Sequence, residues 1–284
     1  MSERQWLSAH IYYHDNLDEV IVRIVAPLAR AGAELFFLRY WDGGPHVRVR
    51  VATEPHTTAG VRRELERRCA DLFRDRPARF TPDPADYARE AAEMARLEQV
   101  TAYAAEPAAN NTLAFVGYEP EYVRYGRAYM AAVERHFTES SRIVLPLVAG
   151  GLSGTRRMTV ALSMILSTWW RCRPDPARLA RAKKVVGALD VDPAFAEVHE
   201  QRREAIAELT RRAADGRWDE GPLTAWTTSV DALAAHVDEP RALFPILNSC
   251  AHLACNRLGV DVSTEALLRY LAARAVTDLA REKG

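Results

Sequence analysis

The stretch that decides the fold of this chain is FFLRYWDGGPHVRVR, residues 36–50. The residues from Leu35 to Tyr40 are mostly apolar or aromatic, as in a buried strand. Residues 42–45, DGGP, are a turn signal. From His46 onward, apolar residues occupy every second position, which is typical of a strand with one face against a core. The stretch therefore predicts two strands joined by a tight turn.

The second of these strands carries a short ladder of cations. His46, Arg48 and Arg50 point to one side of the strand, and three valines point to the other. The valines fix the strand against a core, so the cations stand on rigid sheet. Rigid guanidinium groups suit a carboxylate or a developing oxyanion. A solvated face whose arginines keep a sheet edge soluble explains the spacing equally well.

Composition limits the classes of protein to consider. The chain has 284 residues, of which 48% are hydrophobic, enough for one large domain or two small ones with a sizeable core. The 38 basic and 38 acidic side chains cancel, which argues against nucleic-acid binding through bulk charge. Residues 1–5 are polar, no apolar run is long enough to cross a membrane, and the four cysteines lack a zinc-like spacing. We therefore expect a cytoplasmic protein with reduced, buried thiols and neither metal nor cofactor.

The remaining elements follow an α+β plan. Before the hairpin, the sequence predicts a strand over residues 6–13 and a helix over residues 15–30. After the hairpin, it predicts a helix over 57–76, a second helix from Asp83 to about residue 106, and a strand over 113–118. From Tyr129 onward only helices are predicted, over 129–137, 155–170, from Asp175, 193–212, 223–236 and 247–258, with Pro146 weakening a further one over 142–148. We expect a single domain, 1–284, with a β-rich portion (1–125) packed against a helical portion (126–284).

Two later stretches carry further polar groups. In YEPEYVRYG, residues 118–126, Glu121 and Arg124 stand three apart, so one helical turn makes them neighbours. An ordinary ion pair at a helix start is an alternative explanation. In residues 244–259, an apolar stripe at helical spacing leaves His252 and Asn256 together on a polar seam. A histidine held there can exchange a proton near neutral pH, although this helix alone favours a surface histidine.

Four motifs, taken together, resemble one known family. They are FFLRYWD (36–42), HVRVR (46–50), YEPEYVRYG (118–126) and HLACNRLG (252–259). In this order they resemble the C-terminal elimination domain of class I lanthipeptide dehydratases, which also occurs as a stand-alone protein in thiopeptide pathways. The resemblance covers essentially the whole chain. The sequence departs from the family pattern at Arg127, where the family often has a second glycine.

The resemblance implies an activity, partners and site residues. The implied activity is that of a lyase, which removes glutamate from glutamylated Ser or Thr of a ribosomally made precursor peptide to give dehydroalanine or dehydrobutyrine. The implied partners are this peptide and a separate protein that installs the ester from glutamyl-tRNA, with no direct nucleic-acid or membrane contact; a homodimer is left open. The implied catalytic residues are Arg50, Arg124 and His252. The implied substrate-binding residues are Arg39, His46, Arg48, Glu121 and Asn256.

Two alternatives to elimination stay open. Pyridine synthases look like the elimination domain but close a six-membered ring in a thiopeptide by formal cycloaddition and expel the leader; they tend to lose the Arg and His motifs that this chain keeps. A non-catalytic scaffold that binds the precursor or the glutamylating partner is the second alternative. It predicts that variants at Arg50, Arg124 and His252 leave dehydration intact.

Overall fold

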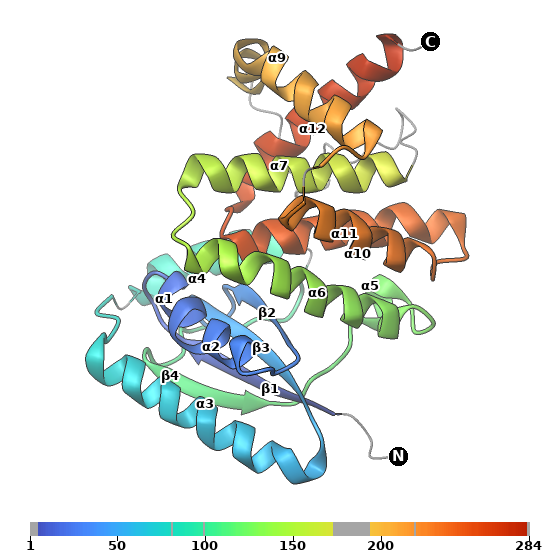
Figure 1. Cartoon of the computed structure of the whole chain (residues 1–284). Coiled ribbons are helices and arrows are strands. Elements are labelled where there is room, and N and C mark those ends of the chain that lie inside the picture. The colour runs from blue at the N-terminus through green and yellow to red at the C-terminus, as the bar shows by residue number, and fades with distance from the viewer. Residues whose placement is uncertain (1–4, 81, 99, 173–193, 219, 283–284) are drawn as a thin grey trace. The chain divides into compact units, whose positions relative to one another are not determined.

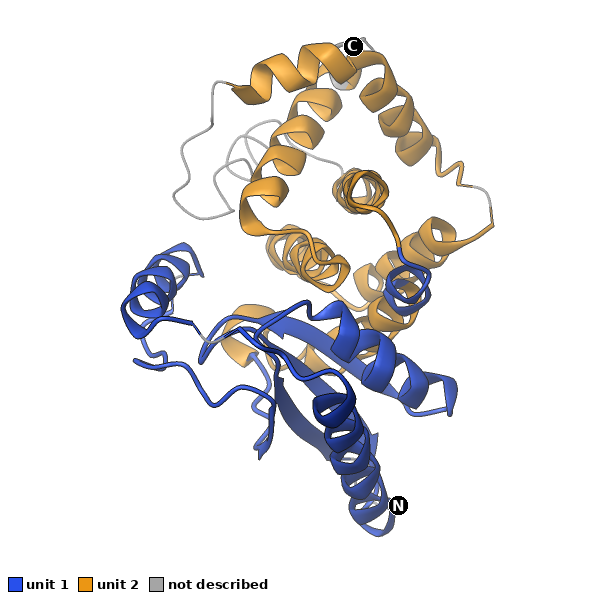
Figure 2. Ribbon diagram, turned by 90° about the vertical axis from the view of Figure 1, so that its left-hand side faces the viewer, with its two compact units in different colours: residues 1–121, 144–151 blue, residues 122–143, 152–284 orange. Residues whose placement is uncertain are grey.

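The structure, a computed structural model, describes residues 5–80, 82–98, 100–172, 194–218 and 220–282. The chain forms two compact units (Figure 2), residues 1–121 with 144–151, and residues 122–143 with 152–284. The expected α+β class is confirmed, because the strands are N-terminal and the later elements are helices (Figure 1).

The first unit is built on a four-stranded antiparallel sheet in the order β2-β3-β1-β4. The strands are β1 (Gln5–Tyr12), β2 (Leu35–Tyr40), β3 (His46–Thr53) and β4 (Thr112–Val116). The predicted hairpin is confirmed as β2–β3, and the two other predicted strands are present to within two residues. Because β3 lies between β2 and β1, it is an interior strand. The interpretation of its arginines as protection of a sheet edge is therefore wrong.

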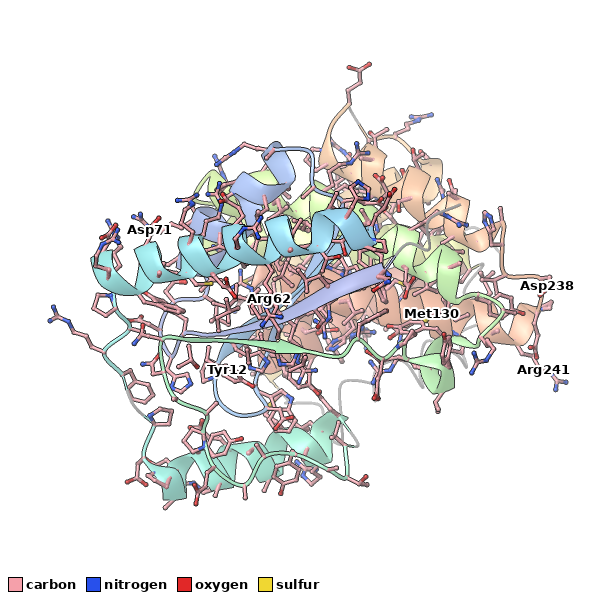
Figure 3. The ribbon with its side chains drawn as sticks, turned by 90° about the horizontal axis from the view of Figure 1, so that it is seen from below. Tyr12, Arg62, Asp71, Met130, Asp238 and Arg241 are labelled. Carbon is pink, nitrogen blue, oxygen red and sulfur yellow. The ribbon has the colours of Figure 1, made fainter. Side chains whose placement is uncertain are left out.

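Helices of the same unit cover the apolar face of the sheet. They are α1 (Asp18–Val20), the π-helix η1 (Ile21–Val25), α2 (Ala26–Arg30) and α3 (Pro55–Asp75). A further helix, α4 (Pro84–Glu98), lies beside the turn between β2 and β3, where the Tyr87 hydroxyl accepts a hydrogen bond from the Gly43 N–H. α3 packs against β1, β3 and β4, and Arg62 reaches from it to within 4.1 Å of the Phe115 ring on β4 (Figure 3). Val47 and Val49 on β3 are fully buried. The predicted helix over 15–30 is confirmed and contains a π turn before Pro27, which lacks an N–H. The predicted helix from Asp83 is confirmed as α4, which ends earlier than predicted.

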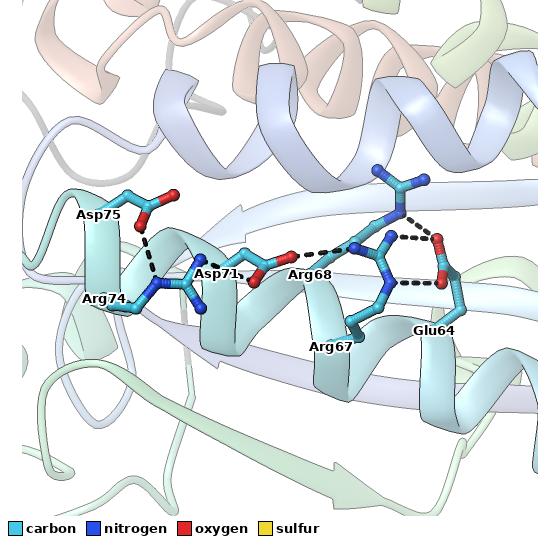
Figure 4. A network of polar contacts seen from close by, with 6 residues as sticks. All are labelled: Glu64, Arg67, Arg68, Asp71, Arg74 and Asp75. Carbon is cyan, nitrogen blue, oxygen red and sulfur yellow. Dashed lines mark hydrogen bonds and ion pairs between the residues drawn. The ribbon is translucent and has the colours of Figure 1, made fainter.

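Helix α3 presents a charged outer face. Glu64, Arg67 and Asp71 form a chain of ion pairs along it, three and four residues apart (Figure 4). Exposed pairs of this kind contribute about 0–1 kcal/mol each, so they add little to the stability of the helix. The helix begins two residues earlier than predicted, because Glu54 forms a capping box with Thr57.

The turn between β2 and β3 depends on glycine. Gly44 has a φ of 93°, and a Cβ added there would lie 2.6 Å from Nε2 of the buried His14. We expect Gly44→Ala to lower the free energy of unfolding by about 2 kcal/mol or more, from backbone strain and the clash together.

Urea unfolding measures this effect. Gly60→Ala is the matched control, because Gly60 lies inside α3 with open space around its Cα and its replacement is expected to stabilise by up to about 1 kcal/mol. Equal stability of the Gly44→Ala variant and the native chain would contradict the prediction.

The second unit is helical and is organised around α7. Its elements are α5 (Tyr122–Tyr125), α6 (Met130–Ala149, whose last residues belong to the first unit), α7 (Gly154–Arg171), α9 (Ala194–Asp215), α10 (Pro222–Ala234), α11 (Pro240–Leu258) and α12 (Val262–Glu282). α7 packs against α9, α10, α11 and α12. This explains why α7 is buried on every side from Ala161 to Trp169.

Most of the later helices are confirmed, with three differences, the first of which is that α11 begins at Pro240 rather than at residue 247. α6 runs through Pro146 and joins two predicted segments, because an interior proline removes one hydrogen bond without necessarily ending the helix. α12 was not predicted, although Asp261 caps it by accepting a hydrogen bond from the Thr264 N–H. The helix expected from Asp175 lies outside the described residues.

The apolar stripe of α11 and most of the cysteines are buried, as expected from the sequence. The predicted apolar stripe of α11 is fully buried, and Gly259 ends the helix with a φ of 77°. All four cysteines are free thiols, and only Cys172 is half-buried rather than buried. None of the helices in the described ranges is both long and apolar enough to cross a bilayer.

Candidate functional site

One face of the sheet in the first unit carries the polar side chains. Residues directly opposed on neighbouring strands point to the same face. The cross-strand pairs between β1 and β3 are Ser8–Arg50, His10–Arg48 and Tyr12–His46. We call these six residues the polar sheet face. The face opposite to it carries the valines of β3 and is the one that α3 covers.

Arg50 is the most deeply buried cation of the polar sheet face. Its side chain is 9% exposed, and its Nε and Nη1 atoms have no hydrogen-bond partner among the described residues. Its Cζ lies 5.9 Å from the Tyr118 ring and 6.0 Å from the Phe36 ring. Burial, together with the charge of Arg48, lowers the pKa of Arg50 to about 10, so it remains a cation at neutral pH. Buried donors without acceptors are costly, and an anion would satisfy them.

Arg48 is held from three sides. Its Nε donates to Nε2 of His46 over 3.1 Å, its Cζ lies 3.4 Å from the centre of the Tyr40 ring, and its Nη2 lies 3.8 Å from Oδ2 of Asp42. Because Nε2 of His46 accepts this bond, its Nδ1 carries the proton and donates to the Gly44 carbonyl over 2.9 Å. Burial lowers the pKa of His46 to about 3, which keeps it in the neutral form that Arg48 requires.

His10 belongs to the polar sheet face but was missed by the sequence analysis. Its ring lies 4.9 Å from that of His46, and its buried Nε2 has no hydrogen-bond partner among the described residues. Burial and then the charge of Arg48 lower the pKa of His10 to about 2, so its ring is neutral. The sequence does contain a signal for it, because His10 alternates with Ala9 and Ile11 in the predicted first strand.

In the second unit, His252 belongs to a chain of buried polar contacts. Its Nδ1 lies 2.8 Å from Oε2 of Glu265, and Oε1 of Glu265 accepts a hydrogen bond from Nε of Arg269 over 2.7 Å. Asn248 accepts hydrogen bonds from Arg269 and Trp169. Burial raises the pKa of Glu265, but His252 and Arg269 outweigh it, so this pKa lies below its ordinary value and the carboxylate is charged. The side chain of His252 is 29% exposed, so part of the ring is accessible while Glu265 holds its Nδ1 edge.

Arg39 is the sequence-predicted residue that lies apart from the other sheet cations. It pairs across the hairpin with Val47, so it points to the helix-covered face of the sheet rather than to that of Arg48. There its Nη2 donates to Oδ1 of Asp18 over 2.6 Å. This geometry indicates a contact between sheet and helix.

The remaining predicted residues lie on or near helices. Glu121 is exposed just before α5, and its charge acts on Arg50. Arg124 is exposed on α5 of the second unit. Asn256 is half-buried on α11, one turn after His252. The joint action of the sheet cations and the helical residues on one substrate stays a prediction.

The chain's family is decided by a match to a family model. The model described as lantibiotic biosynthesis dehydratase C-term matches residues 6–276. The chain belongs to this family. None of the curated proteins matches the chain. The family predicted from the four sequence motifs is thereby confirmed.

Solved structures share the fold of this lantibiotic dehydratase C-terminal protein. The pyridine synthase TbtD from thiomuracin biosynthesis is 20% identical, with 96% of this chain and 98% of that chain covered and a TM-score of 0.81. The tRNA-dependent lantibiotic dehydratase MibB from Microbispora sp. 107891 is also 20% identical, with a TM-score of 0.67; the match covers 98% of this chain and 28% of MibB. TsrL is 17% identical, with 98% and 95% covered and a TM-score of 0.63. At these identities the likeness shows the fold alone.

For a member of the lantibiotic dehydratase C-terminal family, the two clusters offer complementary chemistry. Arg48 and Arg50 offer fixed cationic donors for a carboxylate. His252 offers an imidazole that is oriented by a buried carboxylate. Within the described ranges, no group of three or more His, Cys, Asp or Glu side chains could hold a metal ion.

Proposed function

We propose that this protein eliminates glutamate from glutamylated Ser or Thr side chains of a ribosomally made precursor peptide. A base takes the proton from Cα, the electron pair of that bond forms the Cα=Cβ double bond, and the Cβ–O bond breaks. Glutamate leaves with its carboxylate, and dehydroalanine or dehydrobutyrine stays in the peptide. The reaction consumes no redox equivalent. A separate protein would install the ester from glutamyl-tRNA.

The observation that carries the proposal is the buried guanidinium of Arg50. A cation whose Nε and Nη1 have no acceptor among the described residues supports a site that an anion completes. The glutamyl ester brings one carboxylate and releases a second when the Cβ–O bond breaks. Fixed donors aimed at developing negative charge stabilise a transition state more than a flexible surface cation does.

The other residues take roles that this chemistry needs. Arg48, oriented by His46, binds a carboxylate beside Arg50. Arg124 supplies a further cation. His252 transfers a proton, a role worth about 10²–10⁴-fold in rate. Glu121, Asn256 and Arg39 are proposed to bind substrate or to support these groups, with the ion pair to Asp18 favouring the supporting role for Arg39.

A mass-spectrometric assay with a defined peptide tests the proposal. The purified chain is mixed with a synthetic peptide that carries one O-glutamyl serine. Loss of glutamate with formation of dehydroalanine is the expected result. A matched peptide with an O-glutaminyl serine lacks only the side-chain carboxylate and is expected to react more slowly, because Arg48 and Arg50 then lose an ionic partner. Failure of the native chain to accelerate loss of glutamate would contradict the proposal.

The same assay distinguishes the two alternatives. A pyridine synthase would leave the glutamyl ester unchanged and would close a ring in a peptide that already contains two dehydroalanines. A scaffold would change neither peptide but would bind one of them. Elimination predicts turnover of the glutamyl ester and no ring closure.

A further inference from the structure

Glu265 is a buried carboxylate that neither the sequence motifs nor the proposed residue roles include. The residue is 1% exposed, and both of its carboxylate oxygens are used: Oε1 by Arg269 and Oε2 by His252. Arg269 is also 1% exposed and donates in turn to the side chain of Asn248. A buried ion pair with both partners hydrogen-bonded is rigid, because breaking it leaves an unpaired charge inside the protein. Glu265 therefore has one fixed orientation.

That orientation selects one tautomer of His252. A carboxylate only accepts hydrogen bonds, so the imidazole nitrogen that faces it, Nδ1, must carry a proton. The second ring nitrogen, Nε2, lies on the other side of the imidazole and faces away from Glu265. Since His252 is 29% exposed, part of this ring is open to a partner molecule.

We propose that Glu265, anchored by Arg269, is a positioning residue that keeps the proton of His252 on Nδ1 and presents Nε2 to the peptide substrate. Glu265 acts through His252 and does not itself contact the reacting atoms. The kinetic part of this inference rests on the proposed function, in which His252 transfers a proton. The tautomer is a property of the protein without substrate and is tested separately.

Glu265→Gln is the informative substitution, because the glutamine amide has a donor end and an acceptor end. The Nε–H of Arg269 requires an acceptor, so the amide oxygen will face Arg269. The amide NH₂ group then faces Nδ1 of His252, which must become an acceptor. The substitution thus preserves shape and moves the proton of His252 to Nε2.

The tautomer is measured by ¹⁵N NMR of the histidine side chains near neutral pH. The chain has 8 histidines, and the His252 signals are identified by their absence in His252→Ala. The expected result is a protonated Nδ1 and, for neutral His252, a bare Nε2 in the native chain, with the reverse in Glu265→Gln. A native chain with its proton on Nε2 alone would overturn the proposal, even where Glu265→Gln does not fold.

Kinetics with the O-glutamyl peptide test whether the tautomer matters. We expect Glu265→Gln to lower kcat by about 10–100-fold with little change in KM, as is usual for partners that orient a functional histidine. In a His252→Ala background the same change should have no further effect. An equal loss in both backgrounds would overturn the positioning role and indicate a structural one. Absence of elimination by the native chain would instead contradict the proposed function, while the NMR result still decides the tautomer.

Two variants serve as controls for these experiments. Glu208→Gln on α9 removes an exposed carboxylate that bonds an arginine four residues later, Arg212, and is expected to change neither rate nor tautomer. Glu265→Asp keeps the acceptor and should retain Nδ1 protonation and more activity than Glu265→Gln. A lower rate for Glu265→Asp than for Glu265→Gln in folded protein would contradict the proposal.

Discussion

Replacing Arg50 with methionine is expected to lower the rate of glutamate elimination by about 10²–10³-fold, as removal of one donor from an anion-stabilising site usually does. Methionine is unbranched and apolar, so it replaces the aliphatic stem of Arg50 on β3 without offering hydrogen bonds. Arg48 remains, but a single guanidinium cannot replace the donors of two. The reaction should stall with the glutamylated peptide unchanged in the mass spectrum.

The same substitution is expected to leave the fold as stable as before or more stable. Arg50 is 9% exposed, and two of its nitrogens have no partner among the described residues, so its burial is costly. Its contacts with the Phe36 and Tyr118 rings offset part of this cost. A structural arginine would behave in the opposite way, because its removal would lower stability. Loss of activity without loss of stability is therefore the result specific to an anion site.

Arg62→Met is the matched control for this experiment. Arg62 lies on α3, where it bonds the exposed Glu66 and covers the Phe115 ring. Its replacement should leave elimination unchanged and lower stability by about 1 kcal/mol or less. If folded Arg50→Met and Arg62→Met both eliminate glutamate at the native rate, then Arg50 has no role in the mechanism.

The hairpin that carries Arg50 could be predicted from the sequence because its signals are local. The DGGP turn and the alternating valines fix both strands without knowledge of the rest of the chain. The burial of Arg50 could not be predicted in this way. It depends on β1, about forty residues earlier, pairing with β3 and making β3 an interior strand. Whether the arginines of β3 form a solvated ladder or a buried site therefore depends on strand pairing between distant parts of the sequence.

The helical part of the candidate site shows the same limit. His252 was found because its helix has a clear apolar stripe and a polar seam. Glu265 and Arg269 were missed because they lie on α12, which the sequence analysis did not predict, and because the contact that gives them a role joins two helices. Charged residues four apart are usually a solvated pair. Only the structure shows that both of these residues are 1% exposed.

Acidification from about pH 7 to pH 5 is expected to cost about 2 kcal/mol of stability for each buried histidine that stays neutral in the folded protein. His46 is fully buried in the first unit, and His136 is 2% exposed in the second. Burial lowers the pKa of each to about 3. The charges of Arg48 and Arg50 lower the pKa of His46 further, and the charge of Arg257 does the same for His136. In the unfolded chain a histidine takes up a proton near pH 6.5. Between these values the unfolded state binds more protons, so stability falls as the pH falls and returns as it rises.

His136→Gln isolates the contribution of the second unit. His136 bonds the Ser229 hydroxyl through Nδ1 over 2.8 Å and packs its ring 5.0 Å from Trp226, so the variant will be less stable at every pH. The informative quantity is therefore the difference in unfolding free energy between pH 7 and pH 5, which hydrogen exchange of α6 amides measures. This difference should be about 2 kcal/mol smaller in His136→Gln than in the native chain. His56→Gln, at an exposed histidine, should leave that difference unchanged. The same pH difference in His136→Gln and in the native chain would contradict the prediction, because it would mean that folded His136 is already protonated at pH 5. Packing of the ring against Trp226 and the nearby Arg257 cation oppose this protonation.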